Sequence, residues 1–480
     1  MARVYYEPLD DDGAAALAVE TSRRRSHTGM ILIFEAGVLA TPEGGVDFAR
    51  IRELVASRLP ELPRLRTKLR WIPIERHPIW VDDPEFDLDY HLRHSALPKP
   101  GNRDQLSNTI SRIGASRLDR SRPLWECWVL EGLEGGRFAL VFKIHQALDR
   151  LEGADLIRSI LSASPDRAEI VPPRFTVRPA PAPIELLLSE VVREWNPTKR
   201  AIRQVLGVIR HPRRATDGAQ ERMRGLLKAM GYRLRHPSRS PFDGNLGPHR
   251  AFALHALDLE TVKQVRQSLG GSIHDCVLTL LTGALRRYLE DRRVSPVTLD
   301  LRAVAPVLEA DGATARPWTI ELPLWEATPA ARHERVHEQT RRLRTQTDVA
   351  PGEALVAGSD WMTSLRFALG ARAIGTLEGG QLAVLQSPGP QQTLYLDGAK
   401  LVECYGILPL RDASGLNATV IGYAGGLFVM FNGDPDLGVD VHHLRDALAA
   451  ELAAVAQPGA AGGARSRLLR AVGSPAGSRV

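Results

Sequence analysis

Apolar and polar positions in the first third of the chain alternate between the spacing of strands and that of helices. The apolar run at residues 30–35 predicts a strand, and residues 48–59 carry helical spacing. LWECWVL at residues 124–130 and RFALVFKIH at residues 137–145 flank the turn sequence EGLEGG, which predicts an antiparallel hairpin. After Asp149 the apolar residues recur at helical spacing. We therefore expect a mixed α/β domain over residues 1–185.

The second half of the chain mixes the same two patterns. Ser272 or His274, with Asp275, can cap a helix that runs through CVLTLLTGALRRYLED. A strand at TLDLRAVAPV, a charged helix at residues 331–344, several strands between residues 383 and 431 and a helix at residues 442–455 follow. These elements predict a C-terminal mixed domain over residues 251–456.

Two stretches interrupt or follow the predicted domains. Proline-rich residues 172–183 mark a domain edge, and residues 186–250 read as a basic connector of helices broken by prolines. Residues 457–480 consist largely of Gly, Ala, Ser and Arg, which predicts a disordered tail.

The composition supports a folded, two-domain protein. The chain has 480 residues, of which 44% are hydrophobic and 25% are charged. Its three cysteines are far apart and match neither a metal site nor a disulfide framework, so a reducing cytoplasm fits best. The sequence shows no export signal and no apolar run of about 18 residues, so we expect no membrane-spanning segment.

The net charge of +6 is concentrated in one segment. Residues 199–239 carry twelve Lys and Arg against two acidic residues, so this segment contributes +10 and the remainder about −4. Apolar residues stand among these cations, as in an amphipathic helix on an anionic bilayer. The alternative is a solvated helix that docks on an acidic face of the same protein. Nucleic acid is disfavoured, because no aromatic stacking pattern accompanies the charges.

The candidate chemistry lies at the end of the second hairpin strand. His145 stands four residues before Asp149, a spacing that allows the histidine to act as a general base. This HxxxD pattern is weak alone, since a lone histidine beside an apolar strand is commonly structural. Cys127 reads as a core residue, and the acidic run between Asp82 and Asp89 has no metal-ligand pattern.

Motifs along nearly the whole chain resemble the bacterial wax ester synthase/diacylglycerol acyltransferase family. They occur in the family's order: PLD at 8–10, HTG at 27–29, WVDDPEFDLDYHLRH at 80–94, LDRSRPLWECWVLEGLEGGRFAL at 118–140, NLGPHR at 245–250, HDCVLTLLTGALRRYL at 274–289, LRAVAPV at 301–307, PGP at 388–390 and GLN at 415–417.

The resemblance implies a fold, a reaction and a location. The fold is the two-domain, coenzyme A-dependent acyltransferase type, like chloramphenicol acetyltransferase, with an active-site channel between the domains. The family transfers a long acyl chain from acyl-CoA to diacylglycerol or a fatty alcohol, with no bound cofactor and no metal. The resemblance also implies a cytoplasmic enzyme, peripheral on the inner face of the membrane or on lipid bodies.

This chain departs from the family signature HHxxxDG, in which the second histidine is the general base and the aspartate is structural. Aligned from the strand, His145 is the first histidine and Gln146 replaces the base; aligned from the helix, His145 is the base and Asp149 its structural partner. Glutamine cannot accept a proton at neutral pH. Arg150 replaces the signature glycine, and His274 and Gln386 stand where the family commonly has asparagine.

Three hypotheses follow from the sequence. The leading one is an acyl-CoA:diacylglycerol O-acyltransferase that makes triacylglycerol, with wax ester synthase activity as an extension, in which His145 is the base. The rival is a catalytically impaired relative that binds lipids or acyl chains. A third is an acyltransferase that acts on a non-lipid alcohol or amine, since related folds act on peptides and polyketides.

Overall fold

The computed structural model describes residues 6–71, 78–148, 150–172, 175–179, 240–308, 315–346, 382–387, 389–411 and 414–456. The predicted basic connector as far as residue 239, the predicted tail and Asp149 lie outside these residues.

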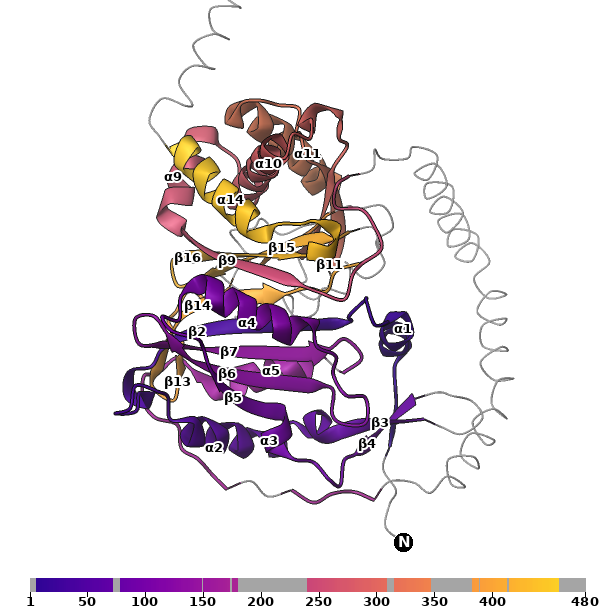
Figure 1. Cartoon of the computed structure of the whole chain (residues 1–480), viewed down its shortest axis with the longest axis vertical. Coiled ribbons are helices and arrows are strands. Elements are labelled where there is room, and N and C mark those ends of the chain that lie inside the picture. The colour runs from indigo at the N-terminus through magenta and orange to yellow at the C-terminus, as the bar shows by residue number, and fades with distance from the viewer. Residues whose placement is uncertain are drawn as a thin grey trace, which may run out of the picture.

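The main sheet of the N-terminal lobe is a seven-stranded mixed sheet (Figure 1). Its strands, in spatial order, are β5 (Leu92–Ala96), β6 (Trp125–Leu133), β7 (Arg137–His145), β2 (His27–Glu35), β14 (Ala399–Ile407), β13 (Tyr395–Leu396) and β8 (Leu161–Ser162). The predicted hairpin is confirmed, because β6 and β7 pair antiparallel. The turn between them places Gly135 and Gly136 at φ 77° and 65°, where glycine is favoured.

The C-terminal lobe contains a six-stranded sheet. Its strands, in spatial order, are β11 (Ala315–Glu321), β10 (Arg302–Leu308), β12 (Leu382–Ser387), β15 (Leu416–Tyr423), β16 (Gly426–Gly433) and β9 (Ala251–Asp258). A smaller sheet in the N-terminal lobe joins β1 (Glu7–Pro8), β4 (Pro78–Asp82) and β3 (Thr67–Trp71).

Helices cover both sheets. The N-terminal lobe has α1 (Asp11–Val19), α2 (Phe48–Arg58), α3 (Leu88–His91), α4 (Arg103–Ala115) and α5 (Arg150–Ile160). The C-terminal lobe has α9 (Leu259–Leu269), α10 (Ile273–Asp291), α11 (Pro329–Gln346) and α14 (Val441–Ala456), gathered on the face of its sheet that points away from the other lobe (Figure 1). The prediction that Ser272 caps a helix is confirmed, since its side chain accepts from the Asp275 amide.

Helix α4 lies between the two lobes (Figure 1). Gly114 near its end approaches the Phe252 ring of β9 so closely that a Cβ atom there would lie 2.5 Å from a ring carbon. The Phe252 amide donates to the hydroxyl of Ser111 on the same helix, at 3.1 Å. A side chain larger than glycine at position 114 would therefore push the lobes apart.

Strand β14 carries the chain of the C-terminal half into the N-terminal sheet. The sequence placed residues 251–456 together in one domain, whereas β14 pairs antiparallel with β2 and extends the other lobe's sheet. Glu403 of β14 accepts two hydrogen bonds of 2.8 Å from the Arg103 guanidinium of α4, and Arg137 of β7 lies 3.2 Å from it. Burial raises the pKa of the Glu403 carboxyl, but these guanidinium groups outweigh it and hold that pKa below its usual value.

We expect Glu403→Gln to destabilise the protein by about 2–3 kcal/mol, because it leaves Arg103 without its anionic partner. This expected loss is smaller than that for a fully buried ion pair, since the Arg103 side chain is 33% exposed. Urea denaturation would measure the change. The control is Asp89→Asn in the exposed Asp89–Arg52 pair, which should change stability by about 1 kcal/mol or less. Equal losses of stability from the two substitutions would contradict a stabilising role for the Glu403–Arg103 pair.

Candidate active site

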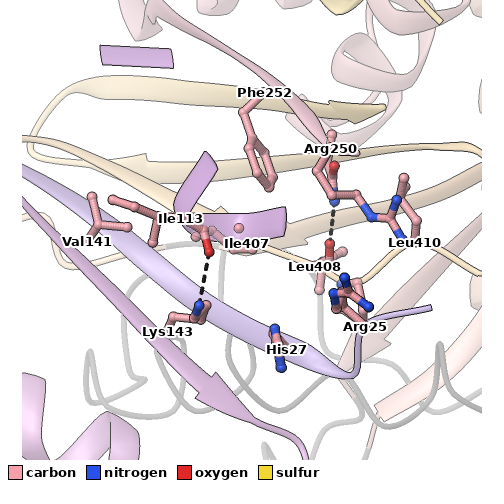
Figure 2. Close-up of a pocket in the computed structure, with 13 residues that line it drawn as sticks. Arg25, His27, Ile113, Val141, Lys143, Arg250, Phe252, Ile407, Leu408 and Leu410 are labelled. Atoms are coloured by element: carbon pink, nitrogen blue, oxygen red, sulfur yellow. Dashed lines mark hydrogen bonds between the residues drawn. The ribbon is translucent and has the colours of Figure 1, made fainter. Parts of the chain in front are cut away.

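A cavity lies where the two lobes meet. Its lining includes Arg25, His27 and Lys143 from the N-terminal half and Arg250, Phe252 and Asn432 from the C-terminal half. Figure 2 shows His27 and Lys143 on one side of this space and Phe252 and Arg250 on the other. His27 of β2 and Lys143 of β7 can therefore contact a molecule that is bound between the lobes.

The pairing of β2 with β7 sets two histidines side by side. His27 begins β2, His145 ends β7, and the two are direct partners across the antiparallel pair. Their ring centroids are 5.6 Å apart. A Cβ atom at Gly29, two residues into β2, would lie 1.9 Å from the Phe142 carbonyl oxygen. Only glycine at position 29 lets the strands approach closely enough for this histidine pair.

Glu20, which follows α1, places a buried carboxylate against both rings. Its Oε1 lies 3.1 Å from His27 Nε2, and its Oε2 lies 3.5 Å from His145 Nε2. The Arg120 guanidinium donates to Oε2 at 2.7 Å. Burial raises the pKa of Glu20, but contacts with His145, His27 and Arg120 outweigh it and hold this pKa far below its usual range. Glu20 is therefore a carboxylate anion.

Both ring nitrogens of His145 face neighbouring groups. The Ala147 amide donates to its Nδ1 at 2.9 Å, and its Nε2 faces Glu20. The residue is only 1% exposed. Its side chain shares the cavity face of β7 with Lys143, because alternate residues of a strand point to the same side. The cavity lining nevertheless includes His27 and not His145.

His27 is buried, and its surroundings keep it neutral. Burial, helped by the nearby charge of Lys143, lowers the pKa of His27 to about 3, although the contact with Glu20 acts in the opposite direction. Neither ring nitrogen has a well-aligned hydrogen-bond partner within the described part of the chain. His27 thus offers a nitrogen lone pair at the cavity.

The other residues of the altered signature follow the strand. Gln146 is half-buried, and its backbone N–H donates to the Ser26 carbonyl oxygen at 2.8 Å. Asp149 lies outside the described residues, so its structural role stays a prediction. Arg150 is the first residue of α5, and its helical backbone does not require the glycine of the family signature.

Two further departures from the family contact each other. His274 at the start of α10 and Gln386 of β12 are joined by a hydrogen bond of 2.8 Å between Nδ1 and Oε1. Burial lowers the pKa of His274. Where the family resemblance implies a pair of asparagines, this chain thus has two longer side chains that bond to one another.

Other polar candidates have structural partners. Asp82 pairs with Arg178 and Asp83 with Lys68, so these two carboxylates of the acidic run are neutralised by cations. Burial raises the pKa of the Cys127 thiol to about 12, which removes it as a nucleophile.

Glu20, His27 and His145 also form the one group of potential metal ligands found among the described residues. Their ligand atoms lie within 4.8 Å of one another. Two histidines and a carboxylate are a ligand set for zinc or iron. Arg120 already donates to Glu20 at 2.7 Å, and Arg117 lies 3.8 Å away, so two cations compete with a divalent ion for the same carboxylate oxygen.

Comparison with known proteins places the fold and the chain. The structure is similar to the wax ester synthase/diacylglycerol acyltransferase of Marinobacter aquaeolei, with a TM-score of 0.67 and 22% identity over 94% of this chain and 98% of that one. A condensation domain of the calcium-dependent antibiotic synthetase shares the fold, with a TM-score of 0.50 and 17% identity over 94% and 97% of the two chains. The fold is thus that of the two-domain acyltransferases and condensation domains, as expected.

Residues 9–277 match the model of the wax ester synthase/diacylglycerol acyltransferase catalytic domain, and residues 318–456 match that of its C-terminal domain. The chain belongs to this family. It is 31% identical to a protein of Mycobacterium tuberculosis named as a diacylglycerol O-acyltransferase, over 85% of this chain and 82% of that protein. It is 29% identical to the O-acyltransferase WSD of Acinetobacter baylyi, over 87% and 90% of the two chains.

Sequence reasoning pointed to His145 but missed its two buried neighbours. His27 appeared only within the HTG motif, and Glu20 had no pattern at all. Glu20 and His145 are 125 positions apart in the chain, so no local spacing could connect them. The remaining signal was the family-like LDRSRP stretch, which contains the Arg120 that holds Glu20.

The lowered pKa of His27 predicts loss of stability on acidification. Below about pH 6.5 the unfolded chain protonates this residue, but the folded chain does so only near pH 3. The stabilisation is therefore complete above pH 6.5 and falls as the pH is lowered toward 3, by about 1.4 kcal/mol per pH unit. Lys143, His145 and Glu20 are the titratable groups that act on the pKa of His27, and Glu20 adds its own loss of stability only at lower pH.

Urea denaturation at pH 7.5 and pH 5 tests this. The wild type should lose about 2 kcal/mol more than His27→Gln between the two pH values. Asp89→Asn, far from the cluster, should behave as the wild type. The same acid dependence in His27→Gln and wild type would contradict a neutral, buried His27.

Proposed function

We propose that this protein transfers a long acyl chain from acyl-CoA to the hydroxyl group of diacylglycerol, and also to that of a long-chain fatty alcohol. The match of residues 9–277 and 318–456 to the two domains of the wax ester synthase/diacylglycerol acyltransferase family carries the proposal. The relatives from Mycobacterium tuberculosis and Acinetobacter baylyi are named as O-acyltransferases. Triacylglycerol or a wax ester is then the product, and free coenzyme A leaves.

The reaction needs a base at the cavity. A neutral alcohol is a weak nucleophile until a base accepts its proton during attack on the thioester carbonyl. Imidazole suits this role at neutral pH. Gln146 cannot fill it, because an amide does not accept a proton under these conditions. We propose that the proton goes to the histidine pair that shares Glu20, either to His145, as the alignment of the signature from the helix predicts, or to His27 opposite it.

Asp149 follows the signature as the structural partner that fixes the turn after β7. A bound cofactor has no step in this chemistry, since acyl-CoA enters as co-substrate and leaves as coenzyme A. The two departures at His274 and Gln386 are joined by a hydrogen bond, so together they keep a polar contact between α10 and β12.

Assay of the purified full-length chain with palmitoyl-CoA and dioleoylglycerol or hexadecanol tests the proposal. We expect one free coenzyme A thiol for each ester formed. The double variant His27→Gln/His145→Gln should lower kcat/KM by about 10²–10⁴, the usual contribution of a general base. His94→Gln, which contacts Glu131 outside the cavity, is the control and should keep wild-type turnover. Binding of acyl-CoA without turnover on either alcohol would instead support the acyl-binding alternative.

We also propose that the enzyme works at an anionic lipid surface, where both substrates reside. The support is the sequence of residues 199–239, with its cations among apolar residues. Among the described helices, none is long and apolar enough to cross a membrane. A peripheral location fits an enzyme whose substrates are membrane lipids.

Vesicle sedimentation tests the lipid surface. Replacing Arg210, Arg213 and Arg214 with Gln should weaken binding to phosphatidylglycerol vesicles by about 100-fold, since each cation near such a surface contributes about 1 kcal/mol. Binding should also weaken with salt. Equal binding of the wild type to neutral phosphatidylcholine vesicles would overturn the electrostatic part of this proposal.

A further inference from the structure

We propose that His27 is the catalytic base of this chain, held by Glu20, and that His145 is a positioning residue for the same carboxylate. The inference rests on the proposed acyl transfer. It assigns to β2 a role that the family signature assigns to the segment after β7. The reason is local to this chain, because glutamine stands at position 146.

Both ring nitrogens of His145 are occupied by neighbouring groups of the protein. The Ala147 amide donates to Nδ1, so that nitrogen is the unprotonated one in the neutral ring. The proton then sits on Nε2, which faces Glu20 Oε2 at 3.5 Å. His145 in this state has no free lone pair for a substrate hydroxyl group. Its side chain is 1% exposed and does not line the cavity.

His27, unlike His145, contacts the cavity. Its Nε2 lies 3.1 Å from Glu20 Oε1, so a neutral ring with the proton on Nε2 faces the carboxylate. Nδ1 then carries the lone pair, and it has no hydrogen-bond partner among the described residues. The same side chain lines the cavity between the lobes (Figure 2). Of the two histidines at Glu20, only His27 combines a vacant nitrogen with contact to the cavity.

The negative charge of Glu20 also favours His27 as the base. A base that accepts a proton becomes a cation, and a fixed carboxylate against the far nitrogen stabilises that cation, as in other carboxylate–histidine pairs. Glu20 is ionised, buried and anchored by Arg120, so it supplies this charge without reorganisation. Burial lowers the pKa of His27, so the resting ring is neutral and its lone pair is available, while Glu20 offsets part of the penalty that burial places on the protonated ring.

The acceptor hydroxyl oxygen forms a bond to the thioester carbon while its proton moves to His27 Nδ1. The carbon–sulfur bond then breaks, the sulfur leaves with its electron pair as the coenzyme A thiolate, and the imidazolium returns the proton to it. His27 is neutral again, and an ester and coenzyme A are the products. His145 keeps its bond to Ala147 throughout and donates to Glu20.

One pair of matched variants tests this assignment. His27→Gln and His145→Gln make the same change at neighbouring buried positions, and each glutamine amide can still donate to Glu20. We expect His27→Gln to lower kcat by about 10²–10⁴ with unchanged binding of acyl-CoA. His145→Gln should lower kcat by about tenfold or less. Added imidazole should restore part of the activity of His27→Ala and none of that of His145→Ala.

The opposite pattern, in which His145→Gln is inactive and His27→Gln turns over normally, would overturn the inference but leave the acyltransferase proposal intact. Failure of the wild type itself would instead refute the proposed function.

Should His27→Gln not fold, the pH dependence of the wild-type activity tests the same assignment. With His27 as base, flanked by Glu20, His145 and Lys143, kcat/KM should change less than about twofold between pH 7.5 and 5.5. A tenfold fall per pH unit below 6.5 would contradict it. Activity that is lost to a chelator and restored by zinc would contradict it too.

Discussion

The carboxylate of Glu20 is the constraint on which the candidate site depends. A charge that is buried must be surrounded by cations or hydrogen-bond donors, or its desolvation would unfold the region. Here the donors are Arg120 and the two histidines that face it from neighbouring strands. Their positions are therefore set by the need to neutralise Glu20. A cluster fixed in this way is also preorganised, since its dipoles and charges need not move when a proton arrives.

The fold delivers this cluster to a place where two lobes meet. Strand β2 lies in the middle of the N-terminal sheet, between β7 and the β14 strand contributed by the C-terminal half. The residues that follow β14 pass the cavity at Leu408, whose carbonyl oxygen accepts from Asn432 Nδ2 at 2.7 Å. The cavity wall opposite His27 is thus built from the same segment that completes the sheet under it. Separation of the lobes would disturb both.

Much of the fold could be read from the sequence, because apolar periodicity reports directly on strands and helices. The hairpin that ends at His145, the Ser272 cap and helices α2, α11 and α14 were all predicted this way. The insertion of β14 into the other lobe could not be predicted, since a strand pattern says nothing about its partner. The site was predicted only at His145. Glu20 and His27 acquire their meaning from pairing between distant segments, and from burial, which the sequence does not display.

The altered signature changes the chemistry less than the substitution alone implies. In the alignment made from the strand, Gln146 takes the place of a signature histidine, but the β2–β7 pair still brings two imidazoles to an ionised carboxylate. The chain keeps the match to both family domains and the interlobe cavity. Transfer of the base role from the end of β7 to His27 of the neighbouring strand β2 keeps the reaction within the same cavity.

A crystal structure with a non-hydrolysable acyl-CoA analogue and a bound alcohol tests this account most directly. The account predicts that the alcohol oxygen lies in the interlobe cavity within hydrogen-bond distance of His27 Nδ1, about 2.6–3.2 Å, and next to the carbonyl carbon. An alcohol oxygen beside Gln146 or His145, with His27 out of reach, would contradict it.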